Sequence, residues 1–489
     1  MKAIVQPSHC FWLLGALTVL VAYSGVVQHF NQVAKTDPDR YFHLALARIT
    51  ANSGLIRQLP QVEHLGWGQR FQEKNFLFTL LTSLAYRNGG ENRALQLGFL
   101  FSLSVGFLLY TLLSLYLPPW TAGLFSILPL ATTDYANRVS LFRPHVLAIC
   151  TFLLFLLGVL QRRKWLCFIG ACLYALAYHA LYVLCAILLA QFGYALFLTF
   201  RLKHPPGRQL RFLATGIGGI LAGILLNPYF PQSLYSTRNS VRMALNLSRV
   251  SEADRPIEIV PMNSADFISD LGFYLVSLLG IWWFLGFSNK FRAQLKTESK
   301  EGETFWILLL SATLFWFLAF FSRRALEYAI PLELTLIAIV MGCIASSKLL
   351  KSGLIAAAVL CFGPSAWNYY RHPLLGSFDT QYVFDALKTI PEHSTKKVFN
   401  CEWDNGAYIL YQRPLLHFID ITDPILLADH APLDHRFRTQ LKEGKIVAPY
   451  GLIHDRFKAD YVLCDNLKVQ NQLEKDPHFR RIYPESAVP

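Results

Sequence analysis

The chain has 489 residues, of which 53% are hydrophobic and only 16% are charged. This balance is more apolar than soluble globular domains show, so we exclude a purely soluble protein. The formal net charge is +13 at pH 7, yet no basic stripe is interleaved with the stacking aromatic residues that a nucleic-acid surface uses. We therefore expect a membrane protein without a nucleic-acid partner, whose excess charge reflects topology and contact with anionic membrane lipids.

Apolar segments recur through residues 1–365, where we expect a transmembrane domain. A hydrocarbon core about 30 Å thick takes roughly 20 apolar residues for each helical crossing, and about eleven segments approach that length. The first has no clear small-residue cleavage site, so we expect a retained anchor. The expected spans lie near residues 10–29, 95–117, 120–133, 144–161, 165–180, 181–200, 212–227, 269–287, 304–321, 326–347 and 353–364.

Basic residues gather in every second loop between these spans. Because cytoplasmic loops retain Lys and Arg, this alternation predicts a cytoplasmic N-terminus. An odd number of crossings then places the tail outside, so we expect a multi-pass inner (plasma) membrane protein with a periplasmic C-terminal domain. The inner-loop charges are Arg162, Arg163, Lys164, Arg201, Lys203, Arg208, Arg211, Lys290, Arg292, Lys296, Lys300, Lys348 and Lys351.

Two long loops are expected outside the membrane. The first, residues 31–94, is too long for a simple connection. From Pro38 its apolar spacing predicts an amphipathic helix on the membrane surface, and a second helical run begins at Glu73. The other, residues 228–268, is rich in Pro, Asn and mixed charge, which is typical of an irregular outer loop.

The tail, residues 366–489, is expected to form a small extracytoplasmic α/β domain that buries its own core. The β-rich pieces KKVFN, AYILY, LLHFID and DYVLCD alternate with helical stretches near 380–390, 432–443 and 466–475. Cys401 and Cys464 both lie in this tail. Outside the cell they can form a disulfide, and the alternative is two buried, unpaired cysteines on neighbouring strands.

Ionisable residues from distant parts of the chain share the outer membrane face under this topology. Charge near a bilayer is costly unless it is paired or lines a wet cavity, so such residues are functional candidates. They are Asp37, Asp39, His43, Glu73, Lys74, Asp134, Arg138, Arg143, His145, His179, Arg323, Arg324 and Glu327.

Outward carboxylates beside arginines have a direct chemical use. A lipid-linked sugar donor presents a phosphate at the interface, which cations bind and neutralise as it departs. A carboxylate can then deprotonate the incoming hydroxyl. Direct displacement at the anomeric carbon inverts its configuration, with base and leaving group on opposite faces of the sugar.

The order of these pieces resembles the GT-C class of polytopic glycosyltransferases, which includes oligosaccharyltransferases, protein mannosyltransferases and lipid A aminoarabinose transferases. The similar segments are TDPDRYFHLALAR, QEKNF, RVSLFRPH, NPYF, SRRALEY, EWDNGAYILY and FIDIT. The resemblance implies a mainly α membrane bundle with a large first extracytoplasmic loop and a small C-terminal α/β domain. The WWDYG signature of oligosaccharyltransferases is absent, and EWDNG at 402–406 matches it only in part. This difference puts asparagine glycosylation in doubt.

Carried over position by position, Asp37 resembles the first-loop aspartate that acts as base in this class. Asp39 is then its expected assistant, and Glu73 matches the second acidic position. These three carboxylates could also hold a divalent cation, Mg²⁺ or Mn²⁺, through oxygen ligands. Two further groups complete the expected site. Donor-phosphate contacts are expected from Arg138, Arg143, His145, Arg323 and Arg324, and substrate positioning from His43, Lys74, His179 and Glu327.

Each assignment competes with a purely structural role. Asp37 before Pro38 is also an ordinary helix start, with Asp as N-cap. His43 can pair with Asp39 on one helix face. Glu73 and Lys74 can be a solvated helix start, and Arg143 and His145 can snorkel to the interface. His179 can be a packed core residue, and Arg323, Arg324 and Glu327 can form an interfacial anchor with an internal ion pair. Trp403, Asp404 and Gly406 can form a turn that links two strands.

The sequence thus predicts a membrane glycosyltransferase that uses a polyprenyl-phosphate-linked donor, with Asp37 as base. Its acceptor is a glycan, a lipid or a protein, which the residues do not distinguish. A ligase or polymerase of polyprenyl-linked glycans is the nearest rival function. A transporter or a non-catalytic assembly protein is a more distant one, although the chain shows none of the internal repeats typical of transporters.

Overall fold

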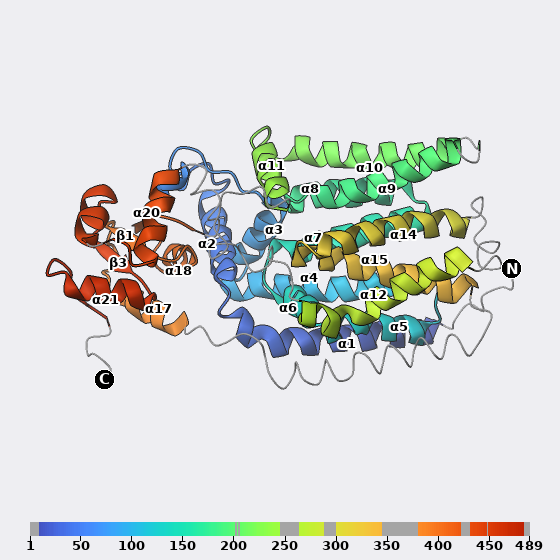
Figure 1. Cartoon of the computed structure of the whole chain (residues 1–489), viewed down its shortest axis with the longest axis horizontal. Coiled ribbons are helices and arrows are strands. Elements are labelled where there is room, and N and C mark those ends of the chain that lie inside the picture. The colour runs from blue at the N-terminus through green and yellow to red at the C-terminus, as the bar shows by residue number, and fades with distance from the viewer. Residues whose placement is uncertain are drawn as a thin grey trace.

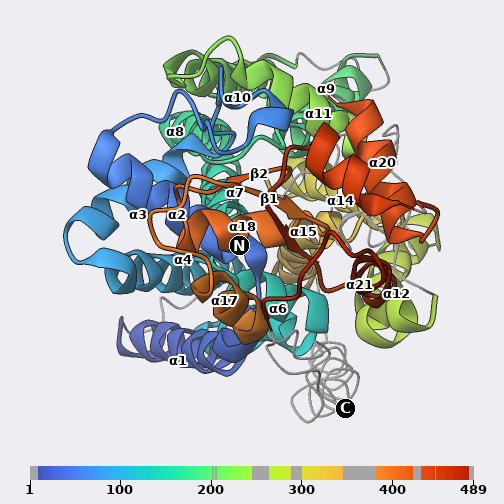
Figure 2. The same cartoon turned by 90° about the vertical axis from the view of Figure 1, so that its left-hand side faces the viewer.

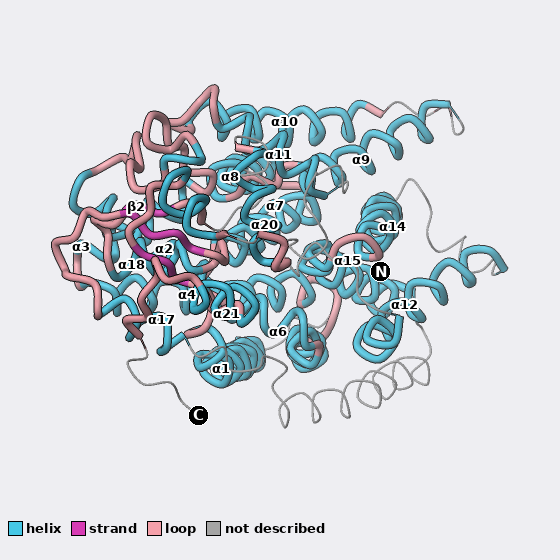
Figure 3. The backbone as a smooth tube through the Cα atoms, turned by 60° about the vertical axis from the view of Figure 1, so that its left-hand side comes forward, coloured by secondary structure: helices cyan, strands magenta, loops and turns pink. Residues whose placement is uncertain are grey.

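The computed structural model describes residues 9–200, 203, 206–244, 264–287, 300–344, 380–421, 431–446 and 448–483. Within this part of the chain the fold is mainly helical, and its strands form one small sheet near the C-terminus (Figure 3). Several expectations lie outside the described residues: the span at 353–364, the domain boundary after 365, part of the loop at 228–268, and Arg201, Lys290, Arg292, Lys296, Lys348 and Lys351.

Every span expected within the described residues coincides with a helix of the bundle in Figure 1. Seven helical segments are long and apolar enough to cross a membrane. They comprise α1 (His9–Ala34), α4 (Gly90–Leu113), α7 (Pro144–Gln161), α9 (Tyr182–Phe200), α10 (Gly207–Leu226), α14 (Lys300–Ala319) and α15 (Leu326–Ile339). The remaining expected spans contain shorter apolar stretches in α5 (Pro119–Ile127), α8 (Lys164–Ala177) and α12 (Ser264–Phe287). The total of about eleven crossings stays a prediction.

The helices differ in how deeply they lie within the bundle. In α7 and α15, 83% of the apolar window is buried inside the protein, whereas α1 and α10 bury 33% and 28%. Leu17 on α1 and Leu225 on α10 are exposed. Because exposed aliphatic side chains on an apolar helix suit a hydrocarbon environment, α1 and α10 present lipid-facing surfaces and α7 and α15 form the centre.

Glycines allow three of the helices to approach closely. A Cβ atom at Gly158 of α7 would lie 2.5 Å from the backbone nitrogen of Cys167 on α8. One at Gly219 of α10 would lie 2.5 Å from the backbone oxygen of Phe168, also on α8. Small residues at such crossings let backbones pack without intervening side chains, which is typical of membrane helices.

The first loop lies at one end of this bundle and contains α2 (Pro38–Ser53), the short turn η1 (Glu63–Leu65) and α3 (Phe76–Arg87) (Figure 1). The helix expected from Glu73 begins only at Phe76, so Glu73 precedes it. The helix expected from Pro38 is present, but it is buried on both sides. Phe42 packs on the tail and Leu44 packs on the bundle. The expectation of a surface amphipathic helix is therefore wrong, because the tail covers the face that would meet solvent.

The tail contains a parallel sheet in the order β2-β1-β3. Its elements are α17 (Thr380–Lys388), β1 (Lys397–Asn400), α18 (Asn405–Gln412), β2 (His417–Phe418), α20 (Pro432–Lys442), η7 (Gly451–Arg456), β3 (Tyr461–Leu463) and α21 (Leu467–Lys475). The prediction of a strand at AYILY is wrong, since that segment lies in α18. Parallel neighbours need a crossover connection, and α18 supplies it between β1 and β2.

The two faces of this sheet bury different cores. Phe399 and Ile419 face a cluster made only of tail residues. Val398 and Phe418, each one position earlier in the chain, face a second cluster that includes Phe42 and other first-loop residues. Alternate residues of a strand point to opposite faces, so this pattern follows from the sequence period. The tail therefore buries one core of its own and shares the other with the first loop.

Polar contacts join the tail to the first loop at the same interface. Arg48 of α2 donates to the last carbonyls of α18, those of Leu410 at 3.3 Å and Tyr411 at 2.7 Å. A cation is favourable there because the carbonyl end of a helix carries partial negative charge. The backbone nitrogen of Phe418 in edge strand β2 donates to the Gln61 carbonyl at 2.8 Å. In the end-on view of Figure 2, β1, β2 and α18 overlie α2.

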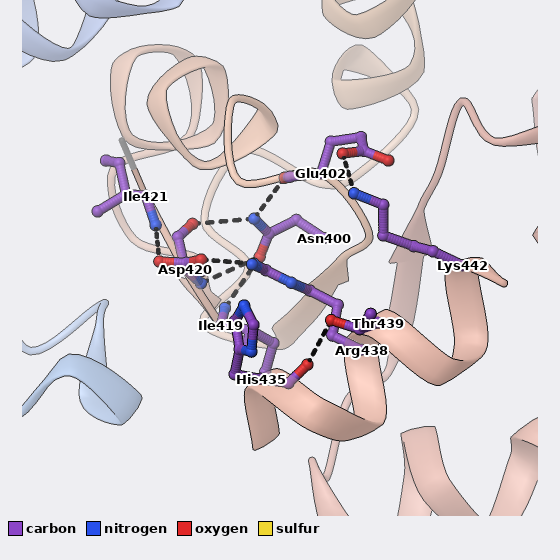
Figure 4. A network of polar contacts seen from close by, with 9 residues as sticks. All are labelled: Asn400, Glu402, Ile419, Asp420, Ile421, His435, Arg438, Thr439 and Lys442. Carbon is purple, nitrogen blue, oxygen red and sulfur yellow. Dashed lines mark hydrogen bonds and ion pairs between the residues drawn. The ribbon is translucent and has the colours of Figure 1, made fainter. Parts of the chain in front are cut away.

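A buried polar network holds the end of β1 (Figure 4). Arg438 of α20 pairs with Asp420, and both side chains are almost fully buried. The Asn400 side chain accepts from the backbone nitrogen of Ile419 at 3.0 Å and donates to the carbonyl of Glu402 at 2.9 Å. Buried charge is tolerated when it is paired and hydrogen-bonded in this way. The network fixes the segment that leads from β1 toward Asp404.

Cys401 and Cys464 form a disulfide with a Cα–Cα distance of 5.1 Å. The cysteines follow β1 and β3, which are neighbours in the sheet. The sequence left open a covalent pair or two unpaired thiols, and the structure has the covalent pair. It belongs to the core cluster that the tail forms by itself.

Substituting Arg48→Ala should loosen the tail, because two charge-assisted hydrogen bonds to α18 are lost. We expect a loss of about 2 kcal/mol in the free energy that separates the docked tail from the open state. Limited proteolysis of the purified full-length protein, followed over denaturant concentration, measures this change. Arg93→Ala is the control, because Arg93 is exposed and bonds Gln96 within its own helix. Equal protease resistance of the two variants would contradict the assigned role of Arg48.

Candidate functional site

A two-point ionic contact between expected site residues joins the first loop to the bundle. Asp37 is the N-cap of α2 and accepts from the backbone nitrogen of Asp39 at 3.2 Å. Arg143 precedes Pro144 at the start of α7. Its Nε lies 2.9 Å from Asp37 Oδ2 and its Nη2 lies 2.5 Å from Asp37 Oδ1. This two-point contact uses the planar fork of guanidinium, which matches a carboxylate.

The same guanidinium reaches a second carboxylate. Arg143 Nη1 lies 3.0 Å from Asp39 Oδ2, so all three nitrogens contact acidic oxygens. The Asp37 side chain is 5% exposed and the Arg143 side chain is 16% exposed. Asp37 thus has both features that the sequence left open, as the structural cap of α2 and as a buried carboxylate held by a cation.

A third carboxylate comes from the tail. Asp404 lies in the turn between β1 and α18, and its Oδ1 is buried without a hydrogen-bond partner. Burial raises the pKa of Asp404 well above its ordinary value, and the negative charges of Asp39 and Asp37 raise it further, while Arg143 opposes the shift. Asp404 therefore belongs to the same electrostatic cluster as the first-loop pair.

The tail turn predicted at Trp403, Asp404 and Gly406 is correct for the first two residues. Gly406 instead lies in α18, where a Cβ atom would be 2.1 Å from the backbone oxygen of Asp420. The glycine therefore permits close approach of α18 to the segment that follows β2. Sequence reasoning missed Asp404 as a site residue, although the partial match at EWDNG was a signal for it.

Arg138 and Glu327 form a buried ion pair between α6 (Thr133–Ser140) and the start of α15. His145 Nε2 lies 2.8 Å from the Arg138 carbonyl oxygen. Glu327 thus has Arg138 as an ion-pair partner, and the internal ion pair expected at Arg323, Arg324 and Glu327 stays a prediction. The charge of Arg138 is balanced inside the protein, which makes it a poor candidate for an additional phosphate contact.

Arg323 lies in η5 (Arg323–Ala325), the turn before α15, and its Nη1 lies 3.6 Å from Asp134 Oδ1. This distance is longer than that of a good hydrogen bond. The Nε of Arg323 is buried and has no hydrogen-bond partner. Arg323 thus keeps more capacity for an anionic ligand than Arg138.

Two histidines lie among cations from separate segments. His179, between α8 and α9, contacts Asn75 through Nδ1 at 3.0 Å. Burial lowers its pKa well below the ordinary value, and Lys74 and Arg324 act in the same direction. Burial also lowers the pKa of His43 on α2 to about 3, assisted by Arg143 and Lys74. Burial and nearby cations therefore favour the neutral form of both imidazoles at pH 7, and the pairing of His43 with Asp39 stays a prediction.

Glu73 occupies a separate position beside the start of α3. It is 3% exposed, its Oε1 accepts from the backbone nitrogen of Asn75 at 2.8 Å, and its Oε2 is buried without a hydrogen-bond partner. Burial raises the pKa of Glu73 to about 7, opposed by the Asn75 hydrogen bond and the charge of Lys74. The expectation of a solvated helix start is therefore wrong for Glu73.

The expected metal ligands Asp37, Asp39 and Glu73 do not form one coordination site. Arg143 holds the two aspartates, whereas Glu73 is held at Asn75. Among the described residues, no cluster of three or more His, Cys, Asp or Glu side chains has an arrangement suited to a metal ion. The side chains present therefore do not fit the divalent cation that the sequence suggested.

Arg40 is another residue that sequence reasoning passed over. It lies in the first turn of α2 and is 8% exposed, and its Nε is buried without a hydrogen-bond partner. Buried arginines normally have an anionic or carbonyl partner. In the sequence, Arg40 is recognisable only as a charged residue near the start of α2, a helix whose other buried residues are mostly apolar.

Comparison by sequence finds no matching protein-family model and no matching curated protein. Solved structures do match. The apo oligosaccharyltransferase of Archaeoglobus fulgidus is 14% identical with a TM-score of 0.52, over 84% of this chain and 65% of that one. The same enzyme tethered to an acceptor peptide containing the NVT sequon is 13% identical with a TM-score of 0.51, over 83% and 64%.

This chain spans just under two thirds of the length of that archaeal protein. At such low identity the likeness establishes the fold. The expected polytopic helical bundle with a small C-terminal α/β part is thereby confirmed: the chain shares the fold of the Archaeoglobus fulgidus oligosaccharyltransferase.

Proposed function

We propose that this protein is an integral membrane glycosyltransferase that transfers a sugar from a polyprenyl-phosphate-linked donor to an acceptor on the extracytoplasmic side. The observation that carries the proposal is the contact of Arg143 with Asp37 and Asp39, with the tail residue Asp404 in electrostatic range, at the junction of bundle, first loop and tail. A carboxyl group with a raised pKa beside other charged groups, as at Asp404, is typical of acid–base sites. The likeness in fold to an oligosaccharyltransferase supports the same class of reaction.

In the proposed reaction, Asp37 accepts the proton of the acceptor hydroxyl as its oxygen attacks the anomeric carbon of the donor. The bond between that carbon and the phosphate oxygen breaks with inversion, and polyprenyl phosphate leaves with the electron pair. Arg143 fixes the Asp37 carboxylate in one orientation. Ordered catalytic groups lower the barrier because less reorganisation is needed at the moment of reaction.

The departing phosphate needs cations near the place where its charge develops. Arg323 and Arg324, in the turn before α15, are the proposed contacts, with Lys74 close to the same region. Arg323 supports this role through its long contact with Asp134 and its buried Nε. Cations placed where negative charge develops stabilise the transition state.

Asp404 gives the tail a direct role near the base. Its raised pKa keeps a protonated carboxyl group available at pH values where an ordinary aspartate is ionised, so it can donate as well as accept a hydrogen bond. We assign it to acceptor positioning. Because the tail shares a core with the first loop, Asp404 is held at a fixed place relative to Asp37.

Replacing Asp37 by Asn should reduce sugar transfer by at least about 10²-fold, since the proposed base is lost while the side-chain shape is kept. Transfer from synthetic polyprenyl-phosphate hexoses and pentoses, by protein in lipid nanodiscs, is the measurement. Asp385→Asn, on the exposed face of α17, is the control and should leave transfer unchanged. Export assays on the same variants test a transporter role: full transfer by the Asp37→Asn variant, or altered export in its place, would reject the enzyme assignment.

Glu73 provides a pH-dependent prediction. Its folded-state pKa of about 7 lies above the ordinary value of 4.5, so the folded protein binds the proton more tightly than the unfolded chain. Stability contributed by the protonated group is complete below about pH 4.5 and is lost as the pH rises through 7, on the order of 3 kcal/mol in total.

Glu73→Gln should therefore flatten the fall in thermal stability between about pH 5 and pH 8, measured by thermal unfolding in detergent. The exposed Glu443→Gln variant should keep the wild-type slope. The Glu73→Gln variant also tests the choice of base: if Asp37 takes the proton, Glu73→Gln retains sugar transfer. Abolished transfer in a folded Glu73→Gln protein would instead move the base to Glu73.

A further inference from the structure

A cation already lies between the first-loop aspartates Asp37 and Asp39, and it is the side chain of Arg143. Arg143 contacts both oxygens of Asp37 and one oxygen of Asp39, at 2.5 to 3.0 Å. A divalent cation bound by the same carboxylates would need those oxygens at about 2.0 to 2.6 Å from the metal. The two arrangements compete for the same lone pairs and the same space.

We propose that the Arg143 guanidinium takes the place of a divalent cation at Asp37 and Asp39, so that this acid pair needs no metal ion. The consequence for sugar transfer rests on the proposed function, whereas the binding claim does not. The sequence pattern suggested a metal because two aspartates separated by one residue resemble an oxygen-ligand pair. The structure assigns their positive partner to the residue that begins α7.

The position of Arg143 makes it a fixed partner. The preceding residue, Phe142, packs against Phe78 and lies next to Gly98, where a Cβ atom would be 2.4 Å from its ring. The following residue is Pro144 at the start of α7. Residues held on both sides fix the backbone of Arg143, and its contacts with Asp37 and Asp39 hold the guanidinium in place.

The charges favour the same conclusion. One guanidinium balances one of the two aspartate charges, and a carboxylate without a cation is costly where it is shielded from water, so a cation is needed at this place. Removing the guanidinium takes a positive partner away from both Asp37 and Asp39 and leaves their carboxylates adjacent, with Asp404 in electrostatic range. Such a set of hard oxygen donors suits Mg²⁺ or Mn²⁺. Arg143 therefore both supplies the positive charge and prevents a metal from supplying it.

Manganese binding to the full-length protein tests this directly. Mn²⁺ is titrated into wild-type protein in lipid nanodiscs, and free ion is measured by electron paramagnetic resonance. We expect no saturable site in the wild type. Arg143→Ala should create a site for Mn²⁺ with affinity at least about tenfold above the wild type, because a charge-assisted partner is removed and its carboxylates remain. The Asp37→Asn/Arg143→Ala double variant should lose it.

Arg93→Ala is the control, since it removes an exposed arginine that bonds Gln96 within its own helix, and it should create no Mn²⁺ site. A saturable Mn²⁺ site in the wild type that disappears in Asp37→Asn would overturn the proposal, as would a folded Arg143→Ala protein that binds Mn²⁺ no better than wild type. If Arg143→Ala does not fold, the wild-type and Asp37→Asn titrations decide by themselves.

Sugar transfer provides a separate readout. If the wild type transfers sugar, we expect its rate to be unchanged by EDTA, and a loss of transfer that added Mn²⁺ restores would overturn the proposal. If no sugar is transferred under any condition, the proposed function fails while the Mn²⁺ titration still tests the role of Arg143. The two failures are therefore distinguishable.

Discussion

The contact between Arg143 and the aspartates at the start of α2 connects the parts of this protein. Asp37 begins α2, and Arg143 immediately precedes α7, one of the most buried helices of the bundle. A guanidinium that bridges two helix starts fixes their relative position, and burial strengthens the attraction because the local dielectric constant is low. The first loop, and the tail that packs on it, are thereby oriented with respect to the membrane bundle.

The second determinant is the core that the tail shares with the first loop. Phe42 and Val398 belong to one buried cluster although they are far apart in the chain. Arg48 and Gln61 add polar contacts at the same interface. The buried Asp420–Arg438 pair then holds the end of β1 from within the tail (Figure 4). Together these contacts hold Asp404 within electrostatic range of Asp37 and Asp39.

The distribution of charge in this region separates residues whose charge is balanced from those with capacity for a ligand. Arg138 is neutralised by Glu327, and both histidines are neutral, since burial and nearby cations lower their pKa values. Arg323 has a long contact with Asp134. Arg143 therefore binds Asp37 and Asp39 tightly, whereas Arg323 keeps a nitrogen that can contact an anionic ligand. The proposed inverting transfer, with its anionic leaving group, would use both features.

The sequence by itself determined the membrane class, the position of the helices and the start of α2, because hydrophobic length and capping residues act locally. It also placed Asp37 and Arg143 among the important residues. It could not determine which acid pairs with which base: Glu327 pairs with Arg138, Arg143 holds Asp37 and Asp39, and Glu73 lies apart from both. The segment AYILY shows the same limit for secondary structure. A short apolar run fits a buried strand or a buried helix equally well. The tertiary structure places this run in α18, the helix that connects the parallel strands β1 and β2. Ion pairing depends on distances of a few ångströms between side chains from distant segments, and those distances exist only after the bundle, the first loop and the tail have packed together.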